Sequence, residues 1–230
     1  MEIIVYGDIH GCLEEFQELR KIVPKNKMEI CVGDLIDRGE YKGEVIEYVR
    51  LNGIKSVMGN HEYKHLRKFL GNDVTLDNDQ LEVYSTLKKV DLEFIQNLPI
   101  FLKFDNTTIL HAGINNKIFL KEEGSYKVSH LLYFRDLDEN GDFLSLGHNN
   151  PNAVYWGEVY DGHEGFIIHG HQPFEDVKKF SNSLAIDTGC VYGNKLSAVY
   201  IKDTKKPWEY EIFQVPAKRE YSEYIGGFRK

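Results

Sequence analysis

The chain has 230 residues, of which 42% are hydrophobic and 28% charged, and its formal net charge is −8. We expect one globular domain over residues 1–230, with the residues after about 216 as a C-terminal extension on the surface. An acidic chain is poorly suited to bind nucleic acid, whose phosphate backbone requires clustered positive charge. A small anionic substrate remains compatible, because a local site can be positive within an acidic protein.

Cysteine content and hydropathy indicate the cellular setting. The three cysteines include no CxxC pair, which argues against a disulfide framework and a zinc knuckle. The first residues, MEIIVYGD, are too short an apolar run for a signal peptide, and no run approaches the roughly 20 apolar residues of a membrane helix. We therefore expect a cytoplasmic protein without a membrane partner.

The first quarter of the chain alternates between strand and helix patterns. Residues 2–6, 28–32 and 54–58 read as short buried strands, and residues 12–23 and 41–52 carry apolar side chains at helical spacing. Such alternation predicts parallel β-α-β units.

The rest of the chain is more varied. Residues 78–98 are predicted helical, 100–113 form a predicted hairpin that turns at Asp105-Asn106, and 114–163 are irregular. Four further strands are expected at 165–170, 183–189, 195–201 and 208–215.

Three glycine-polar pairs follow the first three predicted strands at equal spacing. Gly7-Asp8, Gly33-Asp34 and Gly59-Asn60 are each separated by 26 residues. Equal spacing predicts successive units of similar length, with the polar residues at the carboxyl ends of neighbouring parallel strands. This edge is where open α/β sheets bind ligands.

Five short motifs at these strand ends contain the residues that suggest chemistry. They are GDIHG, GDLIDRG, GNHE, HAG and GHQPF, in that order. Mixed nitrogen and oxygen ligands suit Mn, Fe or Zn, whereas Ca or Mg favours oxygen alone. If these strands share an edge, the converging side chains are Asp8, His10, Asp34, Asn60, His111 and His171.

This ordered motif set, over residues 7–171, resembles the signature of the phosphoprotein phosphatase superfamily of metallophosphoesterases. The segment SLAIDTGCVYGNKLSAVYI resembles its bacterial and phage branch, which includes diadenosine tetraphosphatases and small Ser/Thr-type phosphatases. The resemblance implies an α/β fold, a calcineurin-like sandwich of two mixed β-sheets flanked by α-helices.

The resemblance also implies two divalent metal ions, with Mn²⁺ expected and Fe or Zn as alternatives. Ions held roughly 3.5–4 Å apart supply a hydroxide near neutral pH for in-line attack on phosphorus. By motif, the first ion would be held by Asp8, His10 and Asp34, and the second by the bridging Asp34 with Asn60, His111 and His171.

Three further residues acquire catalytic roles from the same resemblance. Arg38 would bind the phosphate with a forked pair of donors. His61 would be the general acid, oriented by Asp37, whose charge raises the pKa of the imidazole. This assignment explains why GDLIDRG places two aspartates and an arginine on one tight loop.

Three other residues are weaker candidates for the site. Arg135, in LLYFRDLD, is the candidate for a second phosphate-binding arginine, although it could instead pair with Asp136 or Asp138. Tyr192 could line the site or belong to the core. Asp187 is a candidate hydrogen-bond partner for a ligand histidine.

Residues 136–142, DLDENGD, match the start of a calcium loop, but the interpretation fails. Position twelve would be Gly147, where a bidentate glutamate is required. A hairpin turn at Asn140-Gly141 fits this segment better.

The sequence predicts phosphoester or phosphoanhydride hydrolysis and ranks the substrates. Phosphate monoesters, phosphoproteins included, come first because Asp37 and GNHE follow the protein phosphatase form. A dinucleoside polyphosphate is the alternative, and a nucleic-acid diester is third. A metal-binding scaffold without turnover is disfavoured, because Asp37, Arg38 and His61 are all present and none is needed merely to hold metal.

Overall fold

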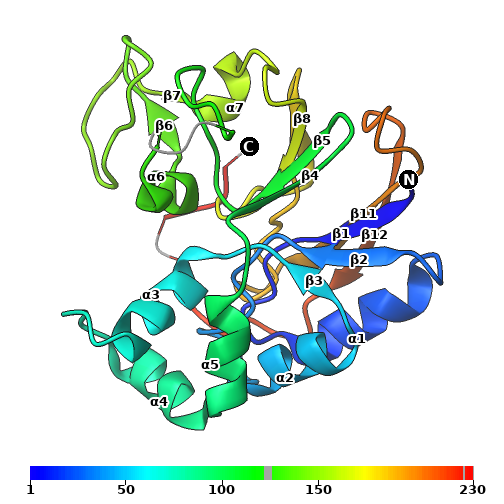
Figure 1. The fold of residues 1–230 in the computed structure, drawn as a ribbon, viewed down its shortest axis with the longest axis vertical. Coiled ribbons are helices and arrows are strands. Elements are labelled where there is room, and N and C mark those ends of the chain that lie inside the picture. The colour runs from blue at the N-terminus through cyan, green and yellow to red at the C-terminus, as the bar shows by residue number, and fades with distance from the viewer. Residues whose placement is uncertain (122–125, 225, 230) are drawn as a thin grey trace.

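Two five-stranded mixed β-sheets form the centre of the computed structural model, which describes residues 1–121, 126–224 and 226–229. The sheets stack on one another, with most of the helices packed outside the first sheet (Figure 1). This arrangement confirms the predicted fold class.

The first sheet has the strand order β12-β11-β1-β2-β3. Its members are β1 (Ile3–Tyr6), β2 (Met28–Cys31), β3 (Lys55–Ser56), β11 (Lys195–Ile201) and β12 (Tyr210–Pro216). Strands β1, β2 and β3 are parallel neighbours, whereas β11 and β12 are antiparallel. The predicted β-α-β units are confirmed.

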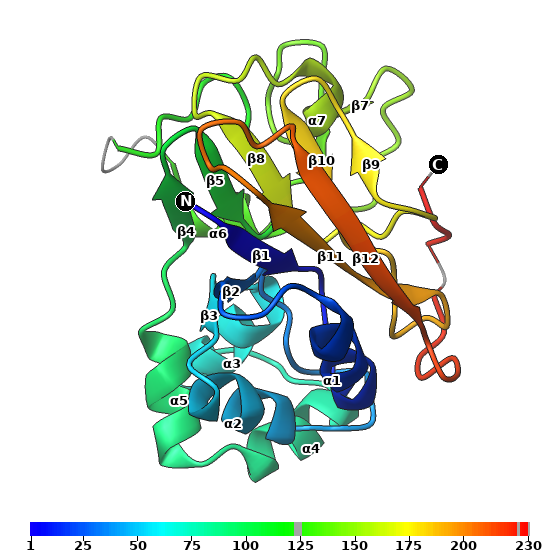
Figure 2. The same ribbon diagram turned by 90° about the vertical axis from the view of Figure 1, so that its right-hand side faces the viewer.

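Helices lie on the outer side of this sheet and share an apolar core with it (Figure 2). They are α1 (Leu13–Ile22), α2 (Glu44–Leu51), α3 (Asn60–Phe69), α4 (Asn78–Thr86) and α5 (Lys89–Gln96). Helix α1 lies against the sheet itself, and others pack on neighbouring helices. The predicted helical region 78–98 is thus two helices, because the backbone is extended at the junction between them.

Helix α3 is absent from the sequence prediction, and its composition explains why. Its buried positions are His61, Glu62, His65 and Leu66, so three of its four buried side chains are polar. A helix that buries polar groups carries no apolar stripe of period 3.6, which is the main signal in sequence.

The second sheet has the order β4-β5-β8-β10-β9. It contains β4 (Phe101–Phe104), β5 (Thr107–Leu110), β8 (Phe166–His169), β9 (Lys178–Lys179) and β10 (Ser183–Ala185). Strands β5, β8 and β10 are parallel, so this sheet also has a parallel centre. The predicted hairpin 100–113 is confirmed as β4 and β5.

In its described residues, the segment predicted as irregular contains four short elements, which are α6 (Val128–Tyr133), β6 (Asp136–Leu137), β7 (Val154–Tyr155) and α7 (Trp156–Val159). The predicted turn at Asn140-Gly141 is confirmed, because Leu137 bridges Phe143 in antiparallel fashion across it.

The C-terminal tail, expected to be an extension on the surface, is held against the rest of the molecule by hydrogen bonds. Beyond Pro216, the amide of Lys218 and the hydroxyl of Tyr221 both donate to the buried carboxylate of Glu15 on α1, at 2.9 and 2.6 Å. Within the described ranges, no helix has the length and apolar character that a membrane span requires.

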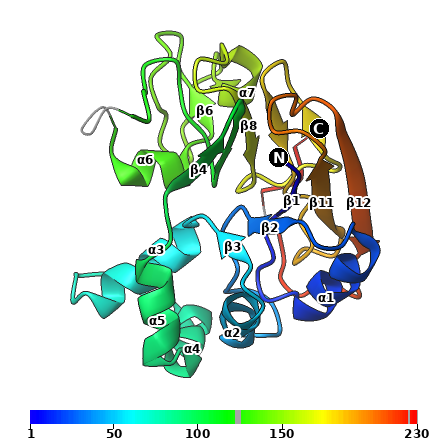
Figure 3. The same cartoon turned by 45° about the vertical axis from the view of Figure 1, so that its right-hand side comes forward.

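Aliphatic and aromatic side chains fill the space between the sheets. This inner core joins the two sheets, which face each other in Figure 3. Its buried members are Ile3, Val5, Ile30, Val32, Val57, Ile109, Phe166, Ile168, Leu184, Ile186, Val199 and Ile201.

Truncating a side chain of this inner core should destabilise the fold. Ile30 on β2 is fully buried, and we expect Ile30→Ala to lower the free energy of unfolding by about 2–5 kcal/mol. The matched control is Ile212→Ala on β12, because Ile212 is 45% exposed and should change stability little. Urea denaturation measures both, and equal losses would contradict this assignment of the core.

Candidate metal centre

Polar side chains from both sheets converge where the carboxyl ends of their parallel strands meet. Asp8 and His10 follow β1, Asp34 follows β2, and Asn60 begins α3 just after β3. The second sheet contributes residues 111 and 171, directly after β5 and shortly after β8. The side chains predicted at strand ends therefore lie close together, and they come from two sheets, not from one.

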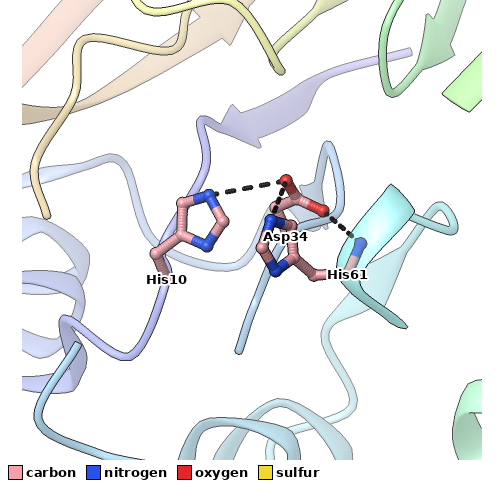
Figure 4. A group of neighbouring side chains, drawn as sticks. All are labelled: His10, Asp34 and His61. Atoms are coloured by element: carbon pink, nitrogen blue, oxygen red, sulfur yellow. Dashed lines mark hydrogen bonds and ion pairs between the residues drawn. The ribbon is translucent and has the colours of Figure 1, made fainter. Parts of the chain in front are cut away.

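Asp34 lies at the centre of the cluster. Its Oδ2 is 3.4 Å from Nε2 of His10 and 3.4 Å from Nε2 of His111. The same oxygen is 4.0 Å from Nε2 of His61, and Figure 4 shows the rings of His10 and His61 both directed at the carboxylate of Asp34. A bridging role for Asp34 is compatible with this position.

A second group of ligand atoms adjoins Asp34. Nε2 of His111 is 2.9 Å from Oδ1 of Asn60 and 3.2 Å from Nδ1 of His171. Asp34, His111 and His171 together form a buried set that could hold a metal ion, and His10, Asp34 and His61 form another.

Backbone carbonyls fix the orientation of two histidines. Nδ1 of His10 lies 2.9 Å from the carbonyl oxygen of Ile36, and Nδ1 of His111 lies 2.9 Å from that of Val32. Because a carbonyl only accepts, each Nδ1 is the donor, and Nε2 of each ring faces the site. Asp187 was a candidate for this orienting role, but it accepts from the amide of Gly189 instead.

The charges of the cluster favour cations. Burial, together with the carboxylates of Asp187 and Asp34, raises the pKa of Asp8 well above its usual value. Burial and the nearby Arg38 lower the pKa of His10 to about 3, which keeps its ring neutral. Buried carboxylates beside neutral imidazoles fit divalent cations, which would offset the negative charge and accept the lone pairs.

His61 is held by a carboxylate that two histidines share. Oδ2 of Asp37 is 2.6 Å from Nδ1 of His61, and Oδ1 is 2.8 Å from Nε2 of His65. Burial alone would raise the pKa of Asp37, but the hydrogen bonds to both rings lower it well below its usual value. The sequence analysis identified His61 and Asp37 but missed His65, which lies one helical turn beyond His61.

The loops of the site have an uncommon backbone. Among the described residues, seven non-glycine residues have a positive φ, and five of these belong to the predicted site. Such conformations are strained for side chains with a Cβ and concentrate at functional sites. The five are His10 (44°), Asp34 (47°), Asp37 (70°), Arg38 (71°) and His171 (70°).

Glu62, the last residue of GNHE, holds these loops together. Its carboxylate accepts from the amides of Asp34 and Leu35 at 2.8 Å each, from Gly59 at 3.1 Å and from Ile36 at 3.3 Å. The sequence analysis quoted this glutamate without assigning it a role, because only the fold places four amides around it.

Two arginines flank the cluster. NH1 of Arg38 is 3.1 Å from Nε2 of His10 and also donates to the hydroxyl of Tyr192. Nε of Arg135 donates to Nε2 of His171 at 3.1 Å. Arg135 thus points to the site, and Tyr192 contacts Arg38.

Comparisons with known proteins agree with this geometry. A family model described as calcineurin-like phosphoesterase matches residues 1–218. A curated protein of Oceanobacillus iheyensis, named bis(5'-nucleosyl)-tetraphosphatase PrpE and described as asymmetrical, is 31% identical, over 86% of this chain and 88% of that protein. A protein of the same name from Anoxybacillus flavithermus is 30% identical, over 94% and 95% of the two chains.

Solved structures show the same fold. One crystal structure, named as a candidate diadenosine tetraphosphatase, superposes with a TM-score of 0.76 at 22% identity, over 98% of this chain and 95% of that one. A metallophosphoesterase from Sphaerobacter thermophilus gives a TM-score of 0.58 at 14% identity, over 95% and 89%. The chain therefore belongs to the calcineurin-like phosphoesterase family and is a metal-dependent hydrolase of phosphoric ester or anhydride bonds.

Proposed function

We propose that this protein hydrolyses dinucleoside polyphosphates, bis(5'-nucleosyl) tetraphosphates above all, at a centre of two divalent metal ions. The observation that carries the proposal is the convergence of nitrogen and oxygen lone pairs around Asp34. In this proposal one ion is held by Asp8, His10 and Asp34, and the other by Asp34, Asn60, His111 and His171.

The ligand chemistry supports Mn²⁺, with Fe or Zn as alternatives, because imidazole nitrogens are mixed with carboxylate and amide oxygens. When bound, the ions supply a nucleophile near neutral pH and neutralise phosphoryl charge. Phosphate binding and proton transfer to the leaving group belong to the protein side chains around the ions.

Three of these side chains have proposed roles in binding and proton transfer. Arg38 and Arg135, on the His10 and His171 sides of the cluster, bind phosphoryl oxygens. His61 donates a proton from Nε2 to the leaving group, since the contact of its Nδ1 with Asp37 fixes the ring and leaves Nε2 free to face the substrate.

The substrate ranking differs from the one made on sequence alone. Phosphate monoesters came first there, and dinucleoside polyphosphates were the alternative. The curated relatives that match 86–94% of the chain are named as tetraphosphatases, and this supports the alternative. A phosphoprotein substrate has no such support. The presence of Asp37, Arg38 and His61 around the cluster supports an enzyme over a scaffold.

Metal-stripped protein should be inactive and should recover with added Mn²⁺. Given Mn²⁺, we expect faster hydrolysis of diadenosine tetraphosphate than of a phosphoserine peptide or a nucleic-acid diester, with chromatography of the nucleotide products as the readout. Fe²⁺, Zn²⁺ and Mg²⁺ in parallel rank the metals. Faster turnover of the phosphopeptide would reverse the ranking, and stoichiometric metal binding without turnover of any substrate would favour a scaffold.

Removing the proposed acid should matter most for leaving groups that need a proton. We expect His61→Asn and Asp37→Asn to slow hydrolysis of phenyl phosphate by about 10²–10⁴-fold, and that of p-nitrophenyl phosphate much less. His163→Asn is the matched control, because His163 pairs with Asp161 in a separate loop. Equal losses on both esters would rule out the general-acid role.

Disturbing the hydrogen bonds that Glu62 accepts from the four loop amides should weaken metal binding. Glu62→Gln replaces one acceptor oxygen by a donor among four amides, so we expect a Mn²⁺ affinity about 10–100-fold lower and a lower free energy of unfolding. Glu82→Gln on α4 is the control, with a side chain 66% exposed. Calorimetric titration with Mn²⁺ measures the affinity. An unchanged value would show that the hydrogen bonds of Glu62 do not position the metal ligands.

A further inference from the structure

A pocket lies beside the candidate metal centre, and the C-terminal tail forms one of its walls. The pocket has a volume of about 440 Å³, within the usual range for small-molecule sites. Arg135, which contacts His171, is part of its lining, so the pocket opens next to the metal cluster. The tail contributes Tyr224, Gly226, Gly227, Phe228 and Arg229.

Main-chain contacts fix the tail in this place. The amides of Tyr221 and Ser222 donate to the carbonyl of Val191, at 2.9 and 3.0 Å. Near the end of the chain, the amide of Arg229 donates to the carbonyl of Pro173 at 3.0 Å. The tail is therefore anchored on both sides of Tyr224, and its aromatic residues are held against the site.

An aromatic cluster connects the metal centre with the pocket wall. The ring of Tyr192, which contacts Arg38, stacks on Tyr224 with centroids 4.5 Å apart and planes 26° apart. The rings of Phe228 and Tyr224 lie edge to face, with their centroids 5.7 Å apart. Tyr224 and Phe228 thus present a preformed apolar wall whose rings remain partly exposed.

Two further lining residues add apolar surface that is exposed to solvent. Leu146 is 82% exposed and Tyr133 is 39% exposed, and both line this pocket. Large apolar side chains left in water around a pocket indicate a ligand with an apolar face.

Charge is distributed unequally along the pocket. Arg229 is neutralised, because its guanidinium forms two hydrogen bonds with the carboxylate of Asp136, at 2.9 and 3.0 Å. Nε of Arg135 donates to Nε2 of His171, and no carboxylate of the described residues forms an ion pair with Arg135, so its charge is available to an anion. The pocket therefore has a cationic end at the metal centre and an aromatic end at the tail.

We propose that this pocket binds one nucleoside of the substrate, with the base against Tyr224 and Phe228 and the adjoining phosphate at Arg135. The inference rests on the proposed function and adds that the tail supplies the nucleobase contact. Stacking on aromatic side chains accepts any base, because every base has a π-face.

The test compares ligands that differ only in the base. We expect the Mn²⁺-loaded protein to bind adenosine 5'-monophosphate at least about tenfold more tightly than ribose 5-phosphate in calorimetric titrations. Tyr224→Leu should remove this preference, Tyr224→Phe should retain it, and Phe228→Leu should reduce it. The ratio of kcat/KM for diadenosine tetraphosphate to that for p-nitrophenyl phosphate should fall in parallel.

Tyr210→Leu is the matched control, because Tyr210 lies on β12, outside this pocket. Equal affinity for the two ligands in the unmodified protein, or an undiminished preference in both Tyr224→Leu and Phe228→Leu, would overturn the inference. Loss of phosphopeptide hydrolysis in these variants with unchanged nucleotide binding would also overturn it. Failure of the proposed function is separate, since the unmodified protein would then not cleave the tetraphosphate.

Discussion

The rest of the structure depends on bringing carboxylate, amide and imidazole side chains from two sheets into one buried place. Burying carboxylates together is unfavourable because they repel one another and lose contact with water, although Asp34 accepts from the amide of His61 and Asp8 from that of His171. The backbone keeps these side chains in place. Five residues of the site have a left-handed backbone conformation, Glu62 accepts from four amides of the loops, and glycines occupy positions where a Cβ would collide. A Cβ at Gly170 would overlap the carboxylate of Asp8, and one at Gly59 would overlap the backbone of Asp34.

The same constraint explains how the site is divided between rigid and variable parts. Strand ends and α3 position the histidines proposed as ligands and the His61–Asp37 pair, with backbone carbonyls fixing two of the rings. The surroundings are built from longer connections and from the tail, which packs against them and meets Arg38 through Tyr192. We infer that chemistry resides in the first part and substrate choice in the second.

Sequence predicted the parts that follow from local pattern. Equal spacing of Gly7-Asp8, Gly33-Asp34 and Gly59-Asn60 located three parallel strand ends, and the motifs located the polar side chains. What it missed depends on tertiary contact. Helix α3 has no apolar stripe. The contact of His65 with Asp37 depends on the fold and cannot be read from the sequence near His65. The local sequence of the tail also does not show that it packs back on the molecule.

Anomalous diffraction from crystals grown with Mn²⁺ tests the central claim most directly. The account predicts two peaks per chain, both in contact with the carboxylate of Asp34, one beside His10 and the other beside His111 and His171. A single peak, or two peaks that do not share Asp34, would contradict the binuclear centre and the roles derived from it.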